Sequence, residues 1–293
     1  MIYITGASGR LGKRLLEMFP KALPLSRRPI IGRKGILTNY SRSQLEKILK
    51  KNDVVLHLAG SMDFENEEEL RKGNVEITEN IAEALPEGKI IYASSVAVYG
   101  KKLAEIPADE YTELKPDSAY AKAKLEAENI VLNRNKENAA LRIATIYGPE
   151  YEDYFKIIKL IDKGKMIIFG NGENRIPFVH VEDVAYSFKL AYEKNAHGIY
   201  VISGKAEKQR EIYAYVAKAL GKKPPWISLP PNIAKALASW AGIKFTDEHF
   251  SILSSDRVFD FTKAYNELGF SPRSLWKGLD EMLTVYKNKY KHS

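Results

Sequence analysis

A strand that runs directly into a turn with three spaced glycines constrains this chain most. The apolar strand Ile2–Thr5 is followed at once by Gly6-Ala-Ser-Gly9-Arg-Leu-Gly12, and an amphipathic helix begins there. Gly6 permits the tight turn, Gly9 lets the backbone approach a pyrophosphate, and Gly12 lets the helix pack closely on a sheet. Free amides at the helix N-terminus favour the phosphates. The pattern predicts a dinucleotide site at Gly6, Ser8, Gly9, Arg10, Leu11 and Gly12, and the alternative is a plain glycine turn.

Short apolar runs alternate with amphipathic segments up to Pro149. Such alternation produces right-handed βαβ units and a parallel sheet. It therefore predicts an α/β protein with a Rossmann-type doubly wound parallel sheet. Strands are expected at Ile2–Thr5, Ala22–Leu25, Gly35–Leu37, Val54–Leu58, Ile90–Ser94 and Ala140–Ile143. Helices are expected over Leu11–Phe19, Ser43–Lys50, Asn66–Leu85 and Ser118–Arg134.

The pattern changes after Gly148-Pro149, where a helical segment, Tyr151–Lys163, leads to a glycine-rich turn. Strands at Phe178–Val181 and Ile199–Ile202 then flank a helix, Val184–Lys194, and we expect both strands to rejoin the main sheet. We expect a dinucleotide-binding Rossmann domain from residues 1–149 plus about 176–202, and a smaller, mostly helical substrate-binding domain from residues 150–175 plus 203–293.

The remainder of the chain is expected to be mostly helical, with breaks at Pro224-Pro225 and Pro230-Pro231. The spacing of apolar residues in the last helix predicts one face that packs in a core. That face would consist of Leu275, Trp276, Leu279, Met282, Leu283 and Tyr286.

Tyr120 and Lys124 place a phenol and an ammonium group four residues apart on an expected helix, so both lie on one face. A tyrosine with its usual pKa of about 10 is a poor base at neutral pH. A neighbouring lysine cation stabilises the phenolate and makes the tyrosine a usable acid or base. The pair predicts acid–base chemistry, and the alternative is a solvated helix face.

The second expected strand ends at Leu25-Ser26-Arg27-Arg28. An NAD site usually places an acid about 20 residues after the turn to hold the ribose 2′-hydroxyl. That acid is missing, and guanidinium groups bind phosphate well. Ser26, Arg27 and Arg28, with Arg10 in addition, therefore favour NADP over NAD. The alternative is that one or both arginines are surface charges.

The composition excludes several classes of protein. The 293 residues include no cysteine, so disulfides, thiolate chemistry and cysteine-built metal sites are excluded. The formal charge is +8, but lysines are dispersed among acids, so we predict no nucleic-acid partner. No apolar run approaches the roughly 20 residues that span a bilayer, and no signal peptide is visible. We expect a cytoplasmic protein with no membrane partner.

Together these residues resemble the extended short-chain dehydrogenase/reductase family, the NAD-dependent epimerase/dehydratase group. The segments that carry the resemblance follow the family's order along the chain. They are Thr5–Gly12 (TGxxGxxG), His57–Gly60 (HLAA), Asn74, Ser94–Gly100 (SSxxVYG), Tyr120–Lys124 (YxxxK), Leu141–Pro149 (LRxxxxYGP), Phe178–Val184 (VHVDDVA) and Leu268–Pro272 (LGxxP).

The resemblance implies Ser95, Tyr120 and Lys124 as catalytic residues. Ser95 would hydrogen-bond the substrate oxygen, Tyr120 would exchange its proton, and Lys124 would lower the tyrosine pKa and hold the nicotinamide ribose. Hydride would pass between the nicotinamide and a substrate carbon. Further cofactor contacts are implied for Leu58, Ala59, Gly60, Asn74, Ala93, Ser94, Tyr120, Lys124 and Ile146. No metal is expected, and His180 is interpreted as a structural histidine.

Substrate recognition departs from the family's nucleotide-sugar pattern. Thr145 stands where epimerases commonly have asparagine, and Ile176-Pro177-Phe178 stands where they have Arg-Asp-Phe. Arg175 lies one position before that triplet, and Arg257 is the candidate for a second diphosphate-binding arginine. The stretch Gly170–His180 is more similar to hydroxysteroid and dihydroflavonol-type reductases.

The first hypothesis is an NAD(P)-dependent oxidoreductase or epimerase acting on a secondary alcohol or ketone, such as one in a nucleotide sugar, in the manner of UDP-glucose 4-epimerase. The alternatives are an NADPH-dependent ketone or aldehyde reductase and a non-enzymatic dinucleotide-binding regulator. Val96-Ala97 replaces the acidic pair that a dehydratase would need. The resemblance also implies a homodimer through the helices Asn66–Leu85 and Ser118–Arg134. Its interface would include Val75, Ile81, Ala82, Leu125 and Ile130.

Overall fold

A seven-stranded parallel sheet forms the centre of the larger part of the molecule. The computed structural model describes residues 1–290 except 65, 231–232, 234–235 and 237–253. The strand order is β11-β6-β5-β4-β1-β2-β3, and every neighbouring pair is parallel. This arrangement confirms the predicted Rossmann-type sheet. The strands are β1 (Ile2–Thr5), β2 (Leu23–Ser26), β3 (Ile36–Leu37), β4 (Val54–His57), β5 (Lys89–Ser95), β6 (Ala139–Ile143) and β11 (Gly198–Ile202).

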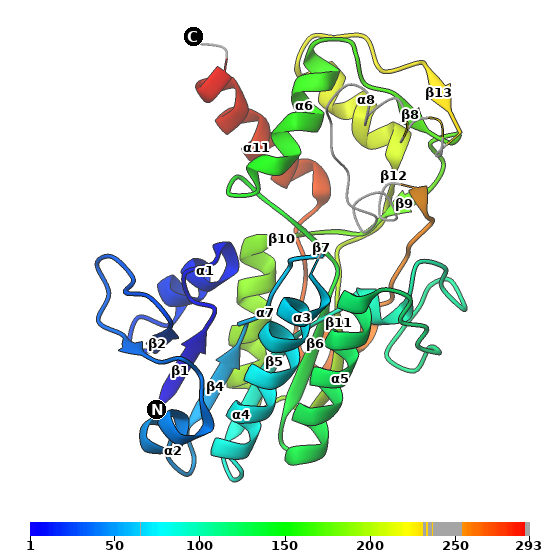
Figure 1. The fold of residues 1–293 in the computed structure, drawn as a ribbon. Coiled ribbons are helices and arrows are strands. Elements are labelled where there is room, and N and C mark those ends of the chain that lie inside the picture. The colour runs from blue at the N-terminus through cyan, green and yellow to red at the C-terminus, as the bar shows by residue number, and fades with distance from the viewer. Residues whose placement is uncertain (65, 231–232, 234–235, 237–253, 291–293) are drawn as a thin grey trace.

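Helices cover both faces of this sheet and give it three layers (Figure 1). On one face α1 (Arg10–Met18) packs against α7 (Val181–Glu193). On the other face α4 (Ile77–Ala84) packs between α2 (Arg42–Ile48) and α5 (Ala119–Arg134). Two apolar cores result, because β-strands buried on both faces send alternate side chains into each layer. The first includes Leu15 and Phe188, and the second includes Leu45, Ile81 and Val131.

The long helix expected at Asn66–Leu85 is present, but it contains a wide turn. It runs as α3 (Glu67–Arg71), a π-helical turn η1 (Lys72–Glu76) and α4. Asn66 caps the start, where its side chain accepts a hydrogen bond from the Glu69 amide at 3.1 Å. π-Helical turns inside α-helices are frequent at functional sites.

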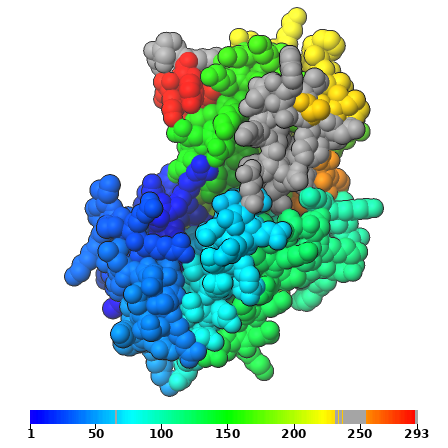
Figure 2. Space-filling model, viewed as in Figure 1, coloured from blue at the N-terminus to red at the C-terminus, as the bar shows by residue number. Residues whose placement is uncertain are grey.

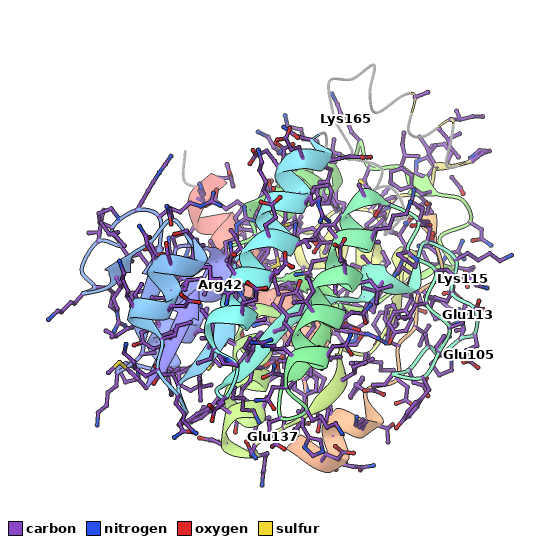
Figure 3. All side chains as sticks on the ribbon, turned by 60° about the horizontal axis from the view of Figure 1, so that its bottom comes forward. Arg42, Glu105, Glu113, Lys115, Glu137 and Lys165 are labelled. Carbon is purple, nitrogen blue, oxygen red and sulfur yellow. The ribbon has the colours of Figure 1, made fainter. Side chains whose placement is uncertain are left out.

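An ion-pair bridge joins two helices on the outer face of this layer. Arg42 of α2 pairs with Glu46 on its own helix and with Glu83 of α4, each at 2.7 Å. Figure 3 turns this face towards the viewer. All three side chains are at least a third exposed, so each pair contributes little to stability.

A second, smaller part lies beyond one end of the sheet, and the outline of the molecule narrows between the two (Figures 1 and 2). Its core joins α6 (Phe155–Asp162), α8 (Gln209–Ala219) and α11 (Leu275–Tyr290). Short strands pair within and beside it: β7 (Thr145–Tyr147) with β10 (Phe178–His180), β8 (Ile168–Phe169) with β13 (Ser228–Leu229), and β9 (Arg175–Ile176) with β12 (Glu207–Lys208). Single turns are η2 (Val96–Tyr99), η3 (Glu152–Tyr154) and η4 (Ala264–Leu268).

One expectation about this region is wrong. The strand predicted at Phe178–Val181 does not rejoin the main sheet, because β10 pairs with β7 as a separate two-stranded sheet. The strand at Ile199–Ile202 does rejoin it, beside β6. Sequence patterns identify a strand by its side chains but do not specify its partner, which explains the difference.

The last helix has the predicted core face. Leu275, Leu279, Met282, Leu283 and Tyr286 are buried. Trp276 is half-buried and packs against Tyr215, with ring centroids 4.8 Å apart. Within the described part of the chain, no helix is both long and apolar enough to cross a membrane. Part of the remainder predicted as helical, together with Pro231, lies outside the described residues.

The candidate dimer face needs correction. Val75, Ile81 and Ala82 are each at most 1% exposed within the single chain, so they are not available to a partner. Leu125 and Ile130 are half-buried. Ile81 and Ala82 belong to the apolar core between these helices and the sheet.

Candidate active site

Tyr120 and Lys124 lie on the first two turns of α5, which packs against β5 and η2. The helix begins there because the Ser118 hydroxyl accepts a hydrogen bond from the Ala121 amide at 3.1 Å. Tyr120 is half-buried, and its ring meets the ring of Phe64 edge to face with centroids 5.4 Å apart. The structure therefore places the helix that carries the predicted pair against β5 and the turn that follows it.

The ammonium group of Lys124 is enclosed. Its Nζ donates a hydrogen bond to the Ala93 carbonyl at 2.5 Å and lies 4.3 Å from the centroid of the Tyr92 ring. Burial lowers the pKa of Lys124 to about 7, and the Glu128 carboxylate opposes that shift. Lys124 is thus a cation that loses its proton near neutral pH.

Ser95 and Ser94 end β5 with different roles. The Ser95 hydroxyl accepts a hydrogen bond from the Ala97 amide at 3.1 Å, and a hydroxyl in that role still carries a hydrogen to donate. The Ser94 hydroxyl is directed to the other side of the strand, where it donates to Glu128 at 2.5 Å. Ser95 is therefore the serine that can meet a substrate.

The glycine turn has the geometry that the sequence predicts. Gly6 has a φ of +63°, and a Cβ there would lie 2.8 Å from the Ala59 amide nitrogen. A Cβ on Gly12 would lie 2.3 Å from the Gly6 carbonyl oxygen, and Gly9 caps α1 in extended conformation. Only glycine fits at positions 6 and 12. Ser8 and Gly9 are exposed at the helix N-terminus, and Leu11 is buried beneath it.

The segment Leu58–Gly60 lies beside the glycine turn and is held by two buried side chains. The Thr5 hydroxyl accepts hydrogen bonds from the Leu58 and Ala59 amides, both at 3.0 Å. The Asn74 side-chain amide, in the π turn, donates to the Ser61 and Leu70 carbonyls, both at 3.0 Å. Hydrogen bonds thus hold the predicted cofactor residues Leu58, Ala59, Gly60 and Asn74 together beside the glycine turn.

The fully buried His57 connects the side chain of Thr5 to the backbone of Asn74 through hydrogen bonds. Since Thr5 already accepts two amide hydrogens, its own hydrogen goes to His57 Nδ1 at 2.7 Å. His57 Nε2 then donates to Thr78 at 2.8 Å, and Thr78 donates to the Asn74 carbonyl at 2.5 Å. Burial lowers the pKa of His57 to about 3, so the ring is neutral. The sequence places His57 in a family motif but does not predict this chain of hydrogen bonds.

Arg27 and Arg10 lie in different surroundings. Arg27 lines a cleft of about 290 Å³ together with Tyr40, Ser41 and Lys72. Arg10 pairs with Asp153 at 2.9 Å and lies over the Tyr151 ring. The Ser26 hydroxyl donates to the carbonyl of Arg28, whose side chain is exposed. Lys72 is a second cation at the cleft that sequence analysis missed, because it comes from the π turn.

The β7–β10 pair borders a narrow apolar cavity of about 50 Å³. Ile146 lies on β7, and Tyr147 next to it packs edge to face on Phe178 at 5.6 Å. Tyr147 and Phe178 line the cavity with aliphatic residues of α6, α8 and α11. This part of the site offers apolar contacts.

The two arginines considered for diphosphate binding are both engaged. Arg175 forms a bidentate pair with Asp256, with distances of 2.9 and 2.7 Å. Arg257 is 4% exposed and donates to the Gly100 and Val96 carbonyls at 2.8 and 2.9 Å. Arg257 thus holds the turn that follows Ser95.

His180, Glu182 and Glu281 place possible metal ligands within 4.8 Å of one another. His180 Nδ1 accepts a hydrogen bond from the Glu182 amide at 3.3 Å. Arg273 pairs with both carboxylates. The group is therefore an ion-pair cluster in which His180 caps α7.

The fold and the site are those of a Rossmann-type dinucleotide-binding protein. They combine a parallel sheet, a glycine turn at a helix N-terminus and a tyrosine–lysine pair. Residues 2–203 match the NAD dependent epimerase/dehydratase family, and the chain belongs to that family. The predicted family is confirmed. So is the predicted use of a nicotinamide adenine dinucleotide as cofactor.

The relatives carry the names of several enzymes. The chain is 26% identical over 277 residues to 3beta-hydroxysteroid-dehydrogenase/decarboxylase isoform 2 of Arabidopsis thaliana, covering 79% of this chain and 48% of that one. It is 26% identical to a putative UDP-glucose 4-epimerase of Methanocaldococcus jannaschii, covering 83% and 90%. Among solved structures, UDP-N-acetylglucosamine 4-epimerase from Bacillus cereus aligns with a TM-score of 0.78 at 22% identity, covering 98% and 99%. The chain spans 48% to 63% of the length of three curated relatives that it matches.

Proposed function

We propose that the chain is an NAD(P)-dependent oxidoreductase or epimerase that transfers hydride at a secondary alcohol or ketone carbon, such as one in a nucleotide sugar. The observation that carries the proposal is the enclosed Lys124 ammonium, one helical turn from Tyr120 and bonded to the Ala93 carbonyl two residues before Ser95. No regulator that only binds a dinucleotide needs this arrangement.

Each catalytic residue has a role that its surroundings support. Ser95 donates its hydroxyl hydrogen to the substrate oxygen, and Tyr120 gives or accepts the proton of that oxygen. The Lys124 cation stabilises the phenolate form of Tyr120. The bound dinucleotide supplies or accepts the hydride. The turn at Gly6 and Gly12 fits its pyrophosphate, because side chains at either position would fill the space.

We infer a preference for NADP from the cleft beside β2. Arg27 brings a guanidinium to it, and a 2′-phosphate is the part of NADP that NAD lacks. Lys72 also lines the cleft, but it pairs with Glu68 at 2.6 Å, so the inference rests on Arg27. Arg10 is not included in this proposal, because it pairs with Asp153. The exposed Arg28 remains a predicted contact only.

A reductase that acts on an uncharged ketone is the second candidate. It is favoured by the pairing of Arg175 with Asp256 and by the burial of Arg257 on backbone carbonyls. Neither guanidinium is then available to a diphosphate.

Native mass spectrometry of freshly purified protein separates the candidates. Bound NAD or NADP that survives desalting is expected of an epimerase, whose cofactor is recycled, and UDP-glucose would be tried first. An empty site that fills with NADPH is expected of a reductase. Failure to bind any of the four nicotinamide dinucleotides would overturn the proposal.

The same experiment reports the number of subunits. A homodimer through α4 and α5 and a cytoplasmic location remain predictions. Light scattering during size-exclusion chromatography that gives a monomer mass at micromolar concentration would contradict the homodimer.

A further inference from the structure

The helix α5 carries a buried carboxylate that has no role in the proposed function so far. Glu128 is 1% exposed and follows Lys124 by four residues, as Lys124 follows Tyr120. Residues at this spacing share one helix face. The face of α5 that meets the sheet therefore carries a phenol, an ammonium and a carboxylate in sequence.

Two elements of the sheet bind this carboxylate. Arg142 of β6 donates to Glu128 Oε1 at 2.7 Å through Nη2, and the exposed fractions of the two side chains are 2% and 1%. Ser94 of β5 donates to Oε2 at 2.5 Å. Arg142 also donates to the Tyr99 hydroxyl at 2.9 Å. The network thus reaches from α5 through β6 to the turn after Ser95.

Burying this network costs free energy. Desolvation of two charges offsets most of their attraction, so a buried ion pair is weak evidence of stability. The Ser94 bond adds a contact that a purely structural Glu128–Arg142 pair does not need. Glu128 is thus a buried charge one helical turn from Lys124, and its cost to stability points to a role at the site.

We propose that Glu128 is a positioning residue for catalysis: through Ser94 it fixes the strand end that presents Ser95, and it supplies the countercharge that keeps Lys124 ionised. The proposal rests on the proposed function, since it assigns Glu128 to that reaction. It requires no direct contact between Glu128 and the substrate.

The charges around Lys124 support the countercharge role. Burial lowers the pKa of Lys124, and the charge of Glu128 raises it. His57 faces Lys124 from β4 and is neutral, since burial lowers its pKa to about 3. Tyr92 faces it from β5 and is neutral, since burial raises its pKa well above 10.0. Tyr120 lies one helical turn before Lys124 on α5.

The direct test measures the ionisation of Lys124, which needs no substrate. The pH dependence of the Lys124 side-chain NMR signal, in protein with labelled lysine and assigned with Lys124→Met, gives its midpoint. In Glu128→Gln the countercharge is lost, so we expect the midpoint to fall by roughly half a pH unit or more. Glu126→Gln is the matched control, because Glu126 lies on the same helix but is 48% exposed and pairs with Arg71.

A second variant covers the case in which Glu128→Gln does not fold, because that change leaves Arg142 buried without its countercharge. Glu128→Gln/Arg142→Gln removes both charges and should still lower the midpoint, because Glu128 is the charge that raises the Lys124 pKa. A lower melting temperature with an unchanged midpoint, in whichever variant folds, overturns the inference and leaves a structural role. It would leave the proposed function standing, which fails separately if Tyr120→Phe retains turnover.

Discussion

Lys124 Nζ donates a hydrogen bond to the carbonyl of Ala93, so the Lys124 side chain fixes α5 to β5 two residues before Ser95. The contact encloses the ammonium beneath the Tyr92 ring. Under the proposed function, the same side chain stabilises the phenolate of Tyr120 one turn earlier. The cost of burying this cation gives the first prediction.

Replacing Lys124 with methionine should stabilise the protein below pH 7. Burial lowers the folded-state pKa to about 7 from 10.5, so the folded protein binds fewer protons than the unfolded chain between those values. Wild-type stability therefore rises with pH across that window, by up to about 1.4 kcal/mol per unit. Urea unfolding at pH 6 and pH 10 should show the advantage of Lys124→Met shrinking at the higher pH. An advantage independent of pH would contradict the burial argument.

Gly6→Ala should abolish dinucleotide binding. Both Gly6 and Gly32 have positive φ, so alanine at either costs about 1 kcal/mol of backbone strain. Only Gly6 would also bring a Cβ against the backbone of Leu58 and Ala59, whereas nothing lies within 4 Å at Gly32. Fluorescence titration with NADPH should show loss of binding in Gly6→Ala and normal binding in Gly32→Ala. Equal affinities would place the cofactor elsewhere.

Arg27→Ala should change the choice between cofactors. We expect NADPH to bind about tenfold or more weakly, because a charge-assisted bond to phosphate is lost, while NADH affinity changes little. Calorimetric titration of both cofactors gives the ratio. Arg33→Ala serves as the nearby comparison and should retain the ratio of the wild type, because Arg33 donates to the Leu16 carbonyl and is not a predicted cofactor contact. A parallel loss of NADPH and NADH affinity in Arg27→Ala would remove the basis for NADP preference.

Arg257→Ala should lower both stability and turnover. It leaves the buried Val96 and Gly100 carbonyls without this donor, which costs about 2–3 kcal/mol. It also frees the turn after Ser95. Denaturant unfolding should show the loss in stability. Unchanged stability would mean that other bonds hold this turn.

Features set by nearby residues could be predicted from the sequence. The glycine turn is one, because Gly6, Gly9 and Gly12 act on the strand and helix that adjoin them. The Tyr120–Lys124 pair is another, since helical spacing alone places both groups on one face. The core face of α11 follows from the same period.

Features that join distant segments could not be predicted. Arg257 and the carbonyl it binds at Gly100 are 157 residues apart, and Glu128 meets Arg142 from a different element. The pairing of β10 with β7, the π turn at Asn74 and the burial of Val75 depend equally on packing. The spacing of Glu128 from Lys124 was the one available signal for the carboxylate, since it repeats that of Lys124 from Tyr120.

Tyr120→Phe tests the central claim most directly. The change removes the hydroxyl that exchanges the proton but keeps the ring that packs on Phe64. Turnover should be measured on UDP-glucose and on a panel of ketones with the cofactor that the wild type binds, alongside the affinity for that cofactor. We predict a loss of about 100-fold or more in turnover, with affinity within a few-fold of wild type. Turnover equal to that of the wild type would contradict the assignment of Tyr120 as the acid or base.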